Sequence, residues 1–105
     1  MFARITFITV SPNHHETVKK IYNKDITPVI KSQKGNVGCW LLEPTDAADD
    51  FISLTEWLSK ADSDAYESSG IYRTLVEMVK PYYTVKPILK TYTVTESVVP
   101  AETPQ

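Results

Sequence analysis

Apolar residues follow two different spacings along the chain, and together these spacings predict four strands and two helical regions. Stretches rich in β-branched and aromatic residues predict strands at 2–10, 36–43, 51–58 and 88–94. From Val18 to Ile30 apolar residues recur at helical spacing instead, after a Ser11-Pro12 pair that is typical of a helix start. A polar loop at 44–50 joins the second and third strands into a hairpin.

Prolines, glycines and serines mark where the helical regions bend or end. Pro28 predicts a kink or break near Thr27, and Gly35 is expected to cap the first region. Ser59 is expected to begin the second region, which a Ser-Ser-Gly break at 68–70 divides. A further helix at 71–80 then ends at Pro81.

The order strand, helix, strand, strand, helix, strand predicts an α+β, ferredoxin-like βαββαβ domain over 1–94, followed by a flexible tail at 95–105. Right-handed crossovers place the helices on one face of a four-stranded antiparallel sheet. The strands nevertheless carry large apolar side chains on both faces, for example Leu54 on one and Trp57 on the other. A bare apolar face is rare in monomers, so we expect a homodimer that buries it.

Composition narrows the class of protein. The chain has 105 residues, is 42% hydrophobic and carries a net charge of −2, which disfavours a nucleic-acid or anionic-membrane partner. It has no apolar run near the roughly 18 residues of a membrane span, and its start does not resemble a secretory signal. One cysteine, Cys39, allows no internal disulfide, so a cytoplasmic setting is the default expectation.

Few residues suggest polar chemistry. Arg4 and Thr6 share one face of the first strand and would be the best anchors for a substrate oxygen if that face meets the helices; alternatively, Arg4 pairs with an acidic residue near the strand edge. His14 and His15 are expected to be solvated and point too far apart to share a metal ion, so we expect no metal site.

Aromatic residues are the other candidates for a binding site. Each could serve simply as packing, but together they could also line an apolar pocket for a flat ligand. They are Tyr22, Trp40, Trp57, Tyr66 and Tyr72. Tyr82 and Tyr83 are placed to close one end of that pocket.

The stretch Glu56-Trp57-Leu58-Ser59, with the Gly38-Cys39-Trp40 entry to the second strand, resembles the antibiotic biosynthesis monooxygenase family. The resemblance covers about residues 2–94 and implies a dimeric α+β barrel with a pocket between sheet and helices. It also implies oxygenation of a small phenol or quinol without a cofactor. Arg4 and Thr6 would then be the catalytic anchors, and the five aromatic residues would contact the small aromatic substrate.

A sister group of that family degrades heme with an Asn, a Trp and a heme-ligating His. The corresponding places here are Thr6, Tyr66 and Val76, and none matches. Heme degradation is therefore disfavoured. Two other hypotheses stay open: a non-enzymatic small-molecule-binding or stress-associated dimer, and a structural dimerisation module without a pocket.

Overall fold

The computed structural model describes residues 1–95, whose elements follow the predicted order. The strands are β1 (Phe2–Ile8), β2 (Asn36–Leu42), β3 (Phe51–Trp57) and β4 (Ile88–Thr93). The helices are α1 (His15–Ile21), α2 (Thr27–Lys31), α3 (Lys60–Glu67) and α4 (Gly70–Val79). Shorter turns are the 3-10 turns η1 (Pro12–His14) and η3 (Lys80–Tyr82) and the π-helical turn η2 (Tyr22–Ile26). Beyond residue 95, the predicted tail lies outside the described residues.

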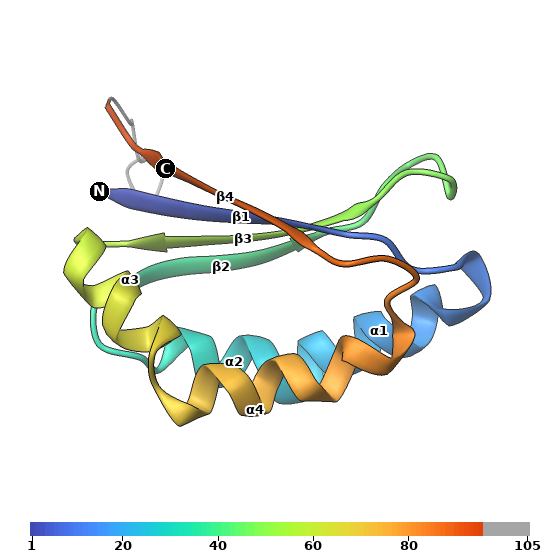
Figure 1. The fold of residues 1–105 in the computed structure, drawn as a ribbon, viewed down its shortest axis with the longest axis horizontal. Coiled ribbons are helices and arrows are strands. Elements are labelled where there is room, and N and C mark those ends of the chain that lie inside the picture. The colour runs from blue at the N-terminus through green and yellow to red at the C-terminus, as the bar shows by residue number, and fades with distance from the viewer. Residues whose placement is uncertain (96–105) are drawn as a thin grey trace, which may run out of the picture.

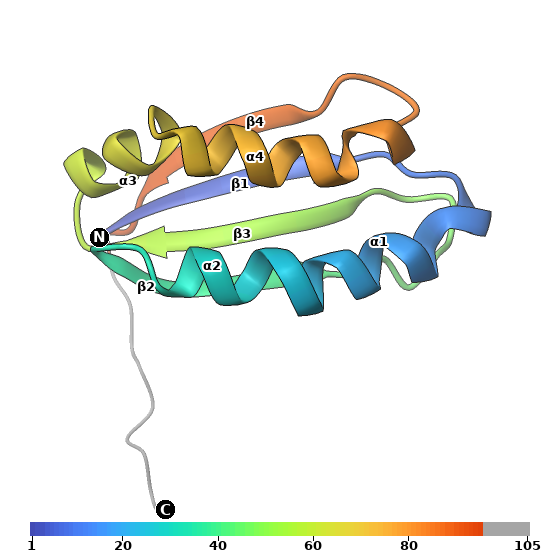
Figure 2. The same cartoon turned by 90° about the horizontal axis from the view of Figure 1, so that it is seen from below.

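The strands form one antiparallel sheet in the order β2-β3-β1-β4, and the helices lie on one of its faces. Seen from below, the α1–α2 segment and the α3–α4 segment run as two rows across the sheet (Figure 2). This arrangement confirms the predicted ferredoxin-like α+β fold. It leaves the opposite face of the sheet without a cover from residues 1–95 (Figure 1).

Pro28 predicts a kink or a break near Thr27, and the first helical region does not break there. Tyr22–Ile26 widens into a π-helical turn, and the helix continues through Thr27 and Pro28 to Lys31. Pro28 has no N–H to donate to the carbonyl four residues earlier, and its ring would crowd that carbonyl. A widened turn removes the clash without ending the helix.

In the second helical region, serine caps determine where α3 and α4 begin, and the region is divided at the predicted Ser-Ser-Gly break. The hydroxyl of Ser59 accepts a hydrogen bond from the Asp62 N–H at 3.2 Å, and that of Ser69 accepts one from the Tyr72 N–H at 3.4 Å. Gly35 has a φ of +82°, the left-handed conformation expected where the first region ends. Ser11 has the extended backbone of an N-cap, but its hydroxyl donates to Asn13 instead of capping the helix.

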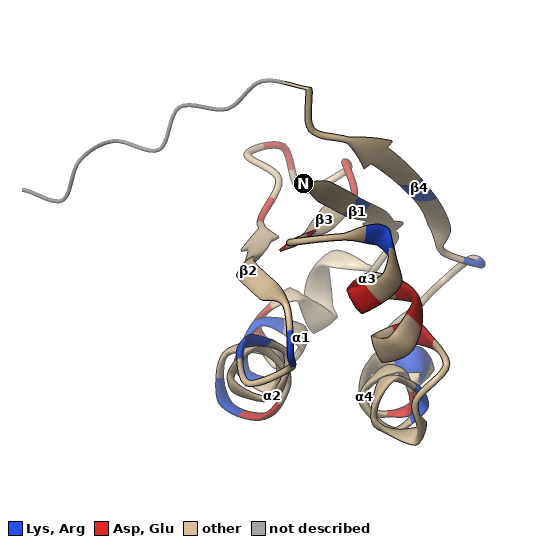
Figure 3. Ribbon diagram, turned by 90° about the vertical axis from the view of Figure 1, so that its left-hand side faces the viewer, with Lys and Arg blue, Asp and Glu red and all other residues tan. Residues whose placement is uncertain are grey.

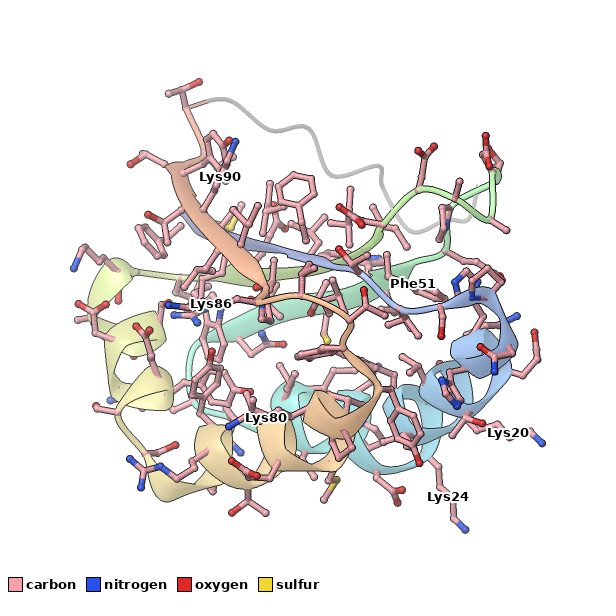
Figure 4. All side chains as sticks on the ribbon, turned by 45° about the vertical axis from the view of Figure 1, so that its right-hand side comes forward. Lys20, Lys24, Phe51, Lys80, Lys86 and Lys90 are labelled. Atoms are coloured by element: carbon pink, nitrogen blue, oxygen red, sulfur yellow. The ribbon has the colours of Figure 1, made fainter. Side chains whose placement is uncertain are left out.

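The hydrophobic core lies between the sheet and the helices. Trp57 and Phe51 of β3 and Val18 of α1 are fully buried there. Phe51 lies at the start of β3, whereas Lys20 and Lys24 extend away from the sheet (Figure 4). The first strand is shorter than predicted: it ends at Ile8, and Val10 forms an isolated bridge to Tyr83.

The uncovered face of the sheet is mostly apolar. Alternation and register place on it one set of side chains from all four strands. We call this set the open face: Ala3, Ile5, Phe7, Trp40, Leu42, Ile52, Leu54, Glu56, Ile88, Lys90 and Tyr92. Charged residues concentrate on the helices and the β2–β3 loop and are sparse on the strands (Figure 3).

The expectation that His15 is solvated is wrong. His15 is buried rather than solvated, because its Nε2 lies 3.0 Å from the Val10 carbonyl oxygen and its ring meets Phe51 edge-on. His14 is half-buried and packs against Tyr82 at 5.3 Å between ring centroids. Within residues 1–95, no helix is long and apolar enough to cross a membrane, and no three His, Cys, Asp or Glu side chains gather as metal ligands would.

Candidate functional site

A cavity of about 90 Å³ lies between the covered face of the sheet and the helices. Its sheet side is polar: Arg4 and Thr6 come from β1, and Ser53 and Thr55 come from β3. Arg4 pairs with Thr55 and Thr6 with Ser53 in the register of the two strands, so the four side chains form a compact square. Three hydroxyl residues and one arginine therefore form the sheet side of the cavity.

The helices give the cavity an apolar and aromatic wall. The wall residues come from both helical rows and from the segment that returns to β4. They are Tyr22, Ile26, Ile30, Tyr66, Tyr72, Leu75, Val76, Val79, Tyr83 and Pro87. A flat ligand here would meet tyrosine rings on several sides and the polar square on the sheet.

Arg4 is the charged group of this lining, and only 5% of its side chain is exposed. Its Nη1 lies 3.0 Å from Oε1 of Glu67, at the end of α3, and its guanidinium carbon lies 5.3 Å from the centre of the Tyr72 ring. A buried cation is costly without a partner, so the ion pair and the ring stabilise it. Arg4 thus pairs with an acidic residue, but that residue comes from a helix rather than the strand edge.

An aromatic series leads from the core to Arg4. Trp57 stacks on Tyr66 at 5.0 Å between ring centroids, and Tyr66 meets Tyr72 edge-on at 5.4 Å. The indole Nε1 of Trp57 donates to the Thr55 hydroxyl at 2.9 Å. Trp57 therefore supports two lining residues, Thr55 and Tyr66, from behind.

The buried tyrosines are neutral hydrogen-bonding groups. Burial raises the pKa of Tyr22 to about 12, although contacts with Ser53 and Tyr83 partly offset the effect. Burial also raises the pKa of Tyr66 and of Tyr83 above the usual range for a phenol. Near neutral pH these hydroxyls can donate hydrogen bonds to an oxyanion, but they cannot act as bases.

The structure brings together most of the residues predicted for the site. Arg4, Thr6, Tyr22, Tyr66 and Tyr72 line the cavity. Trp57 lies behind it, fully buried, and is not among the lining residues.

The predicted position of Trp40 in the wall of the pocket is wrong. Trp40 pairs with Leu54 across the β2–β3 register, so it lies on the open face with 45% of its surface exposed and does not contact the cavity. A Cβ at Gly38 would collide with its indole ring, which covers that glycine. Cys39 is the neighbour that faces the helices, with its sulfur 4.0 Å from the Thr27 hydroxyl.

Sequence reasoning missed three polar residues at or next to the site: Ser53 and Thr55, which line the cavity, and Glu67, which pairs with Arg4. Ser53 and Thr55 alternate with apolar residues in β3 and share the side of Trp57, so the strand period was a usable signal. Glu67 carried no such signal, because its contact with Arg4 depends on how α3 crosses the sheet. Of the two tyrosines expected at the pocket end, Tyr83 lines the cavity and Tyr82 contacts His14.

Comparison with known proteins now identifies the family. A model of the antibiotic biosynthesis monooxygenase family matches residues 1–78, three quarters of the sequence. The chain belongs to this family, which confirms the resemblance drawn from its sequence. No protein among curated sequences matches it significantly.

Solved structures share the fold at low sequence identity. A structure described as an antibiotic biosynthesis monooxygenase is 14% identical, with a TM-score of 0.77 over 91% of this chain and 100% of that one. Rv0793 from Mycobacterium tuberculosis is 16% identical, with a TM-score of 0.76 over 93% and 98%. The heme-degrader MhuD from the same organism, solved with two hemes in its active site, is 18% identical, with a TM-score of 0.79 over 94% and 100%.

Proposed function

We propose that this protein is an oxygenase that acts without a cofactor on a small phenol- or quinol-like aromatic substrate held in the central cavity. The observation that carries the proposal is one buried cation, Arg4, facing a wall of neutral tyrosines. An aromatic oxyanion fits such a site, because the guanidinium stabilises its charge and the rings stack against it. Membership of the monooxygenase family supports the reaction class.

For this reaction the protein needs mainly to bind and orient the substrate. An electron-rich phenolate or enolate shielded from water can pass electrons directly to O₂. When a ring CH₂ becomes a carbonyl, the substrate supplies four electrons, one oxygen atom enters the product and the other leaves as water. In this reaction Arg4 would hold the oxyanion, and Thr6 would orient it through its hydroxyl group.

Heme does not fit these residues. The three places that correspond to the heme-degrading set, Thr6, Tyr66 and Val76, all line the cavity, but they supply neither an imidazole nor an amide. The cavity of about 90 Å³ is also far below the roughly 300 Å³ at which typical ligand pockets begin. A compact substrate that enters as the wall residues move agrees better with this space than a porphyrin.

Oxygen uptake tests the proposal. Wild-type protein should consume O₂ with at least one member of a panel of hydroxylated naphthalenes and anthrones, equally with and without a metal chelator. Thr6→Val removes a hydroxyl from the cavity and should slow turnover about tenfold. Thr74→Val, on the outer surface of α4, is the matched control and should not affect turnover.

A second candidate is a protein that binds such a ligand without changing it. The lining within the described residues includes no carboxylate or imidazole to act as a base, which favours this alternative. Ligands of the panel would then raise the melting temperature without any O₂ uptake. This result would replace the oxygenase with a binding protein.

The open face supports the second part of the proposal, a homodimer. Trp40, Leu42, Ile88 and Tyr92 are each 44% or more exposed, around a centre of half-buried apolar side chains. Two copies that press these faces together would form the barrel of the family and bury roughly 800 Å² or more on each partner. We propose this packing as the functional state.

A further inference from the structure

The ion pair between Arg4 and Glu67 connects two hollows of the molecule. Arg4 lines the inner cavity, whereas Glu67 lines a wider cleft of about 580 Å³ on the outside, where α3 meets α4. Tyr72 and Val76 line both spaces. The cavity and the outer cleft therefore share two side chains and are joined by one ion pair.

The two members of the ion pair differ in their access to water. Arg4 is 5% exposed and extends from the middle of the sheet, so its charge has little contact with solvent. Glu67 is 45% exposed and is the last residue of α3, next to the Ser68-Ser69-Gly70 break. Glu67 can turn into water at little cost, but Arg4 then needs another anion.

We propose that a small aromatic anion enters from the outer cleft and takes the place of Glu67 on Arg4, so that the site selects ligands already ionised at working pH. The inference rests on the proposed use of this cavity and specifies its substrate class: acidic phenols and enols rather than neutral rings. Glu67 acts as an internal competitor that occupies the guanidinium until the ligand arrives.

The groups around Arg4 explain why the ligand must bring its own charge. Glu67 and Tyr66 face it from α3, Tyr72 from α4, and Thr55 and Thr91 flank it in the sheet register. Glu67 is the one anion in this group, and Tyr66 stays neutral because burial raises its pKa. An incoming anion keeps the charge of the site balanced when Glu67 leaves, whereas a neutral ligand does not.

The test compares 4-nitrophenol with its methyl ether, 4-nitroanisole, which has nearly the same shape but cannot ionise. Nitrophenolate has its own visible absorption, so a pH titration reads the pKa of the bound ligand directly. We expect wild-type protein to lower that pKa by about one unit or more, as a cation at close range does. Nitroanisole should bind at least tenfold more weakly than nitrophenolate.

The decisive variant is Glu67→Gln, because it removes the competitor and leaves Arg4 in place. A site that exchanges anions should bind nitrophenolate about tenfold more tightly in this variant, measured by calorimetry. Glu16→Gln is the matched control: Glu16 is an exposed glutamate of α1 that lies 3.0 Å from Lys19 and lines neither the cavity nor the outer cleft. That variant should bind nitrophenolate like the wild type.

Opposite results overturn the inference. If Glu67→Gln binds nitrophenolate equally or more weakly while its circular dichroism shows a folded protein, Glu67 does not compete for Arg4. Equal binding of nitroanisole would likewise rule out selection for charge. These are binding measurements, so their outcome is independent of the proposed oxygenase activity. Charge-selective binding without O₂ uptake from any phenol would reject the oxygenase but would still support the replacement of Glu67 by the ligand on Arg4.

Discussion

The two faces of the sheet carry opposite kinds of side chains at their centres. On the covered face, Arg4 and three hydroxyl residues form the middle of β1 and β3, where Arg4 and Thr55 are buried and Thr6 and Ser53 are half-buried. On the open face, the same strands present Ile5, Phe7, Ile52 and Leu54. A chain selected only to fold alone would place these sets the other way round. The inversion is the arrangement expected if, as proposed above, the covered face binds a ligand and the open face packs against a second copy.

The strongest test of the contrast between the two faces is to place a charge at the centre of the open face. Leu54→Glu would bury an unpaired carboxylate on each copy of a dimer, so we expect the dissociation constant to rise about a thousandfold or more, about 4 kcal/mol. Leu58→Glu is the control, because Leu58 follows β3 and is 65% exposed. Sedimentation velocity over a dilution series measures both. Wild-type protein that sediments as a monomer at micromolar concentration would end the dimer proposal.

Much of the fold could be predicted because local chemistry determined it. Ser59 and Ser69 cap their helices, and Gly35 has the positive φ that few other residues adopt. The sequence around Pro28 was ambiguous, since a proline can end a helix or be absorbed by a widened turn. The choice between these outcomes depends on whether the helix has enough contacts with the sheet to continue, and Ile26 and Ile30 supply them.

The sequence predicted a site residue correctly only where a single strand or helix determines which way that residue faces. Arg4 and Thr6 follow from the period of a single strand, and the structure places both at the cavity. Trp40 was placed wrongly because its face depends on the β2–β3 register, which shifts between Asn36 and Gly38. A one-residue shift moves every following side chain to the other face, and composition does not reveal it.

Substitution of the two tryptophans tests the contrast between the faces, because Trp57 lies on the covered face and Trp40 lies on the open face. Trp57→Ala removes a fully buried ring that stacks on Tyr66, so we expect a loss of about 3–5 kcal/mol in the free energy of unfolding. Urea denaturation should give this loss at every protein concentration. Trp40→Ala should instead weaken the dimer, so its effect should depend on concentration. Equal, concentration-independent losses would contradict the division between the faces.

High pH tests whether the covered side is dry. The folded pKa of Tyr22, about 12, lies above its unfolded value near 10, so the folded state keeps a proton that the unfolded chain loses. The stabilisation is complete below pH 10 and should be lost between about pH 10 and 12, at most about 2–3 kcal/mol. Urea denaturation across this range should show the decline, and Tyr22→Phe should reduce its slope. A flat wild-type profile would mean that water reaches the hydroxyl.

The smallest expected effect concerns one hydroxyl beneath the covered face. Ser63 of α3 is fully buried, and its Oγ has no hydrogen-bond partner among the described residues, so Ser63→Ala should stabilise the fold by about 1 kcal/mol. Ser59→Ala in the same helix removes a working cap and should cost about 1 kcal/mol. Thermal denaturation should show melting shifts of opposite sign. If Ser63→Ala destabilises instead, that hydroxyl has a partner such as a bound water, and the covered side is more polar than its described groups imply.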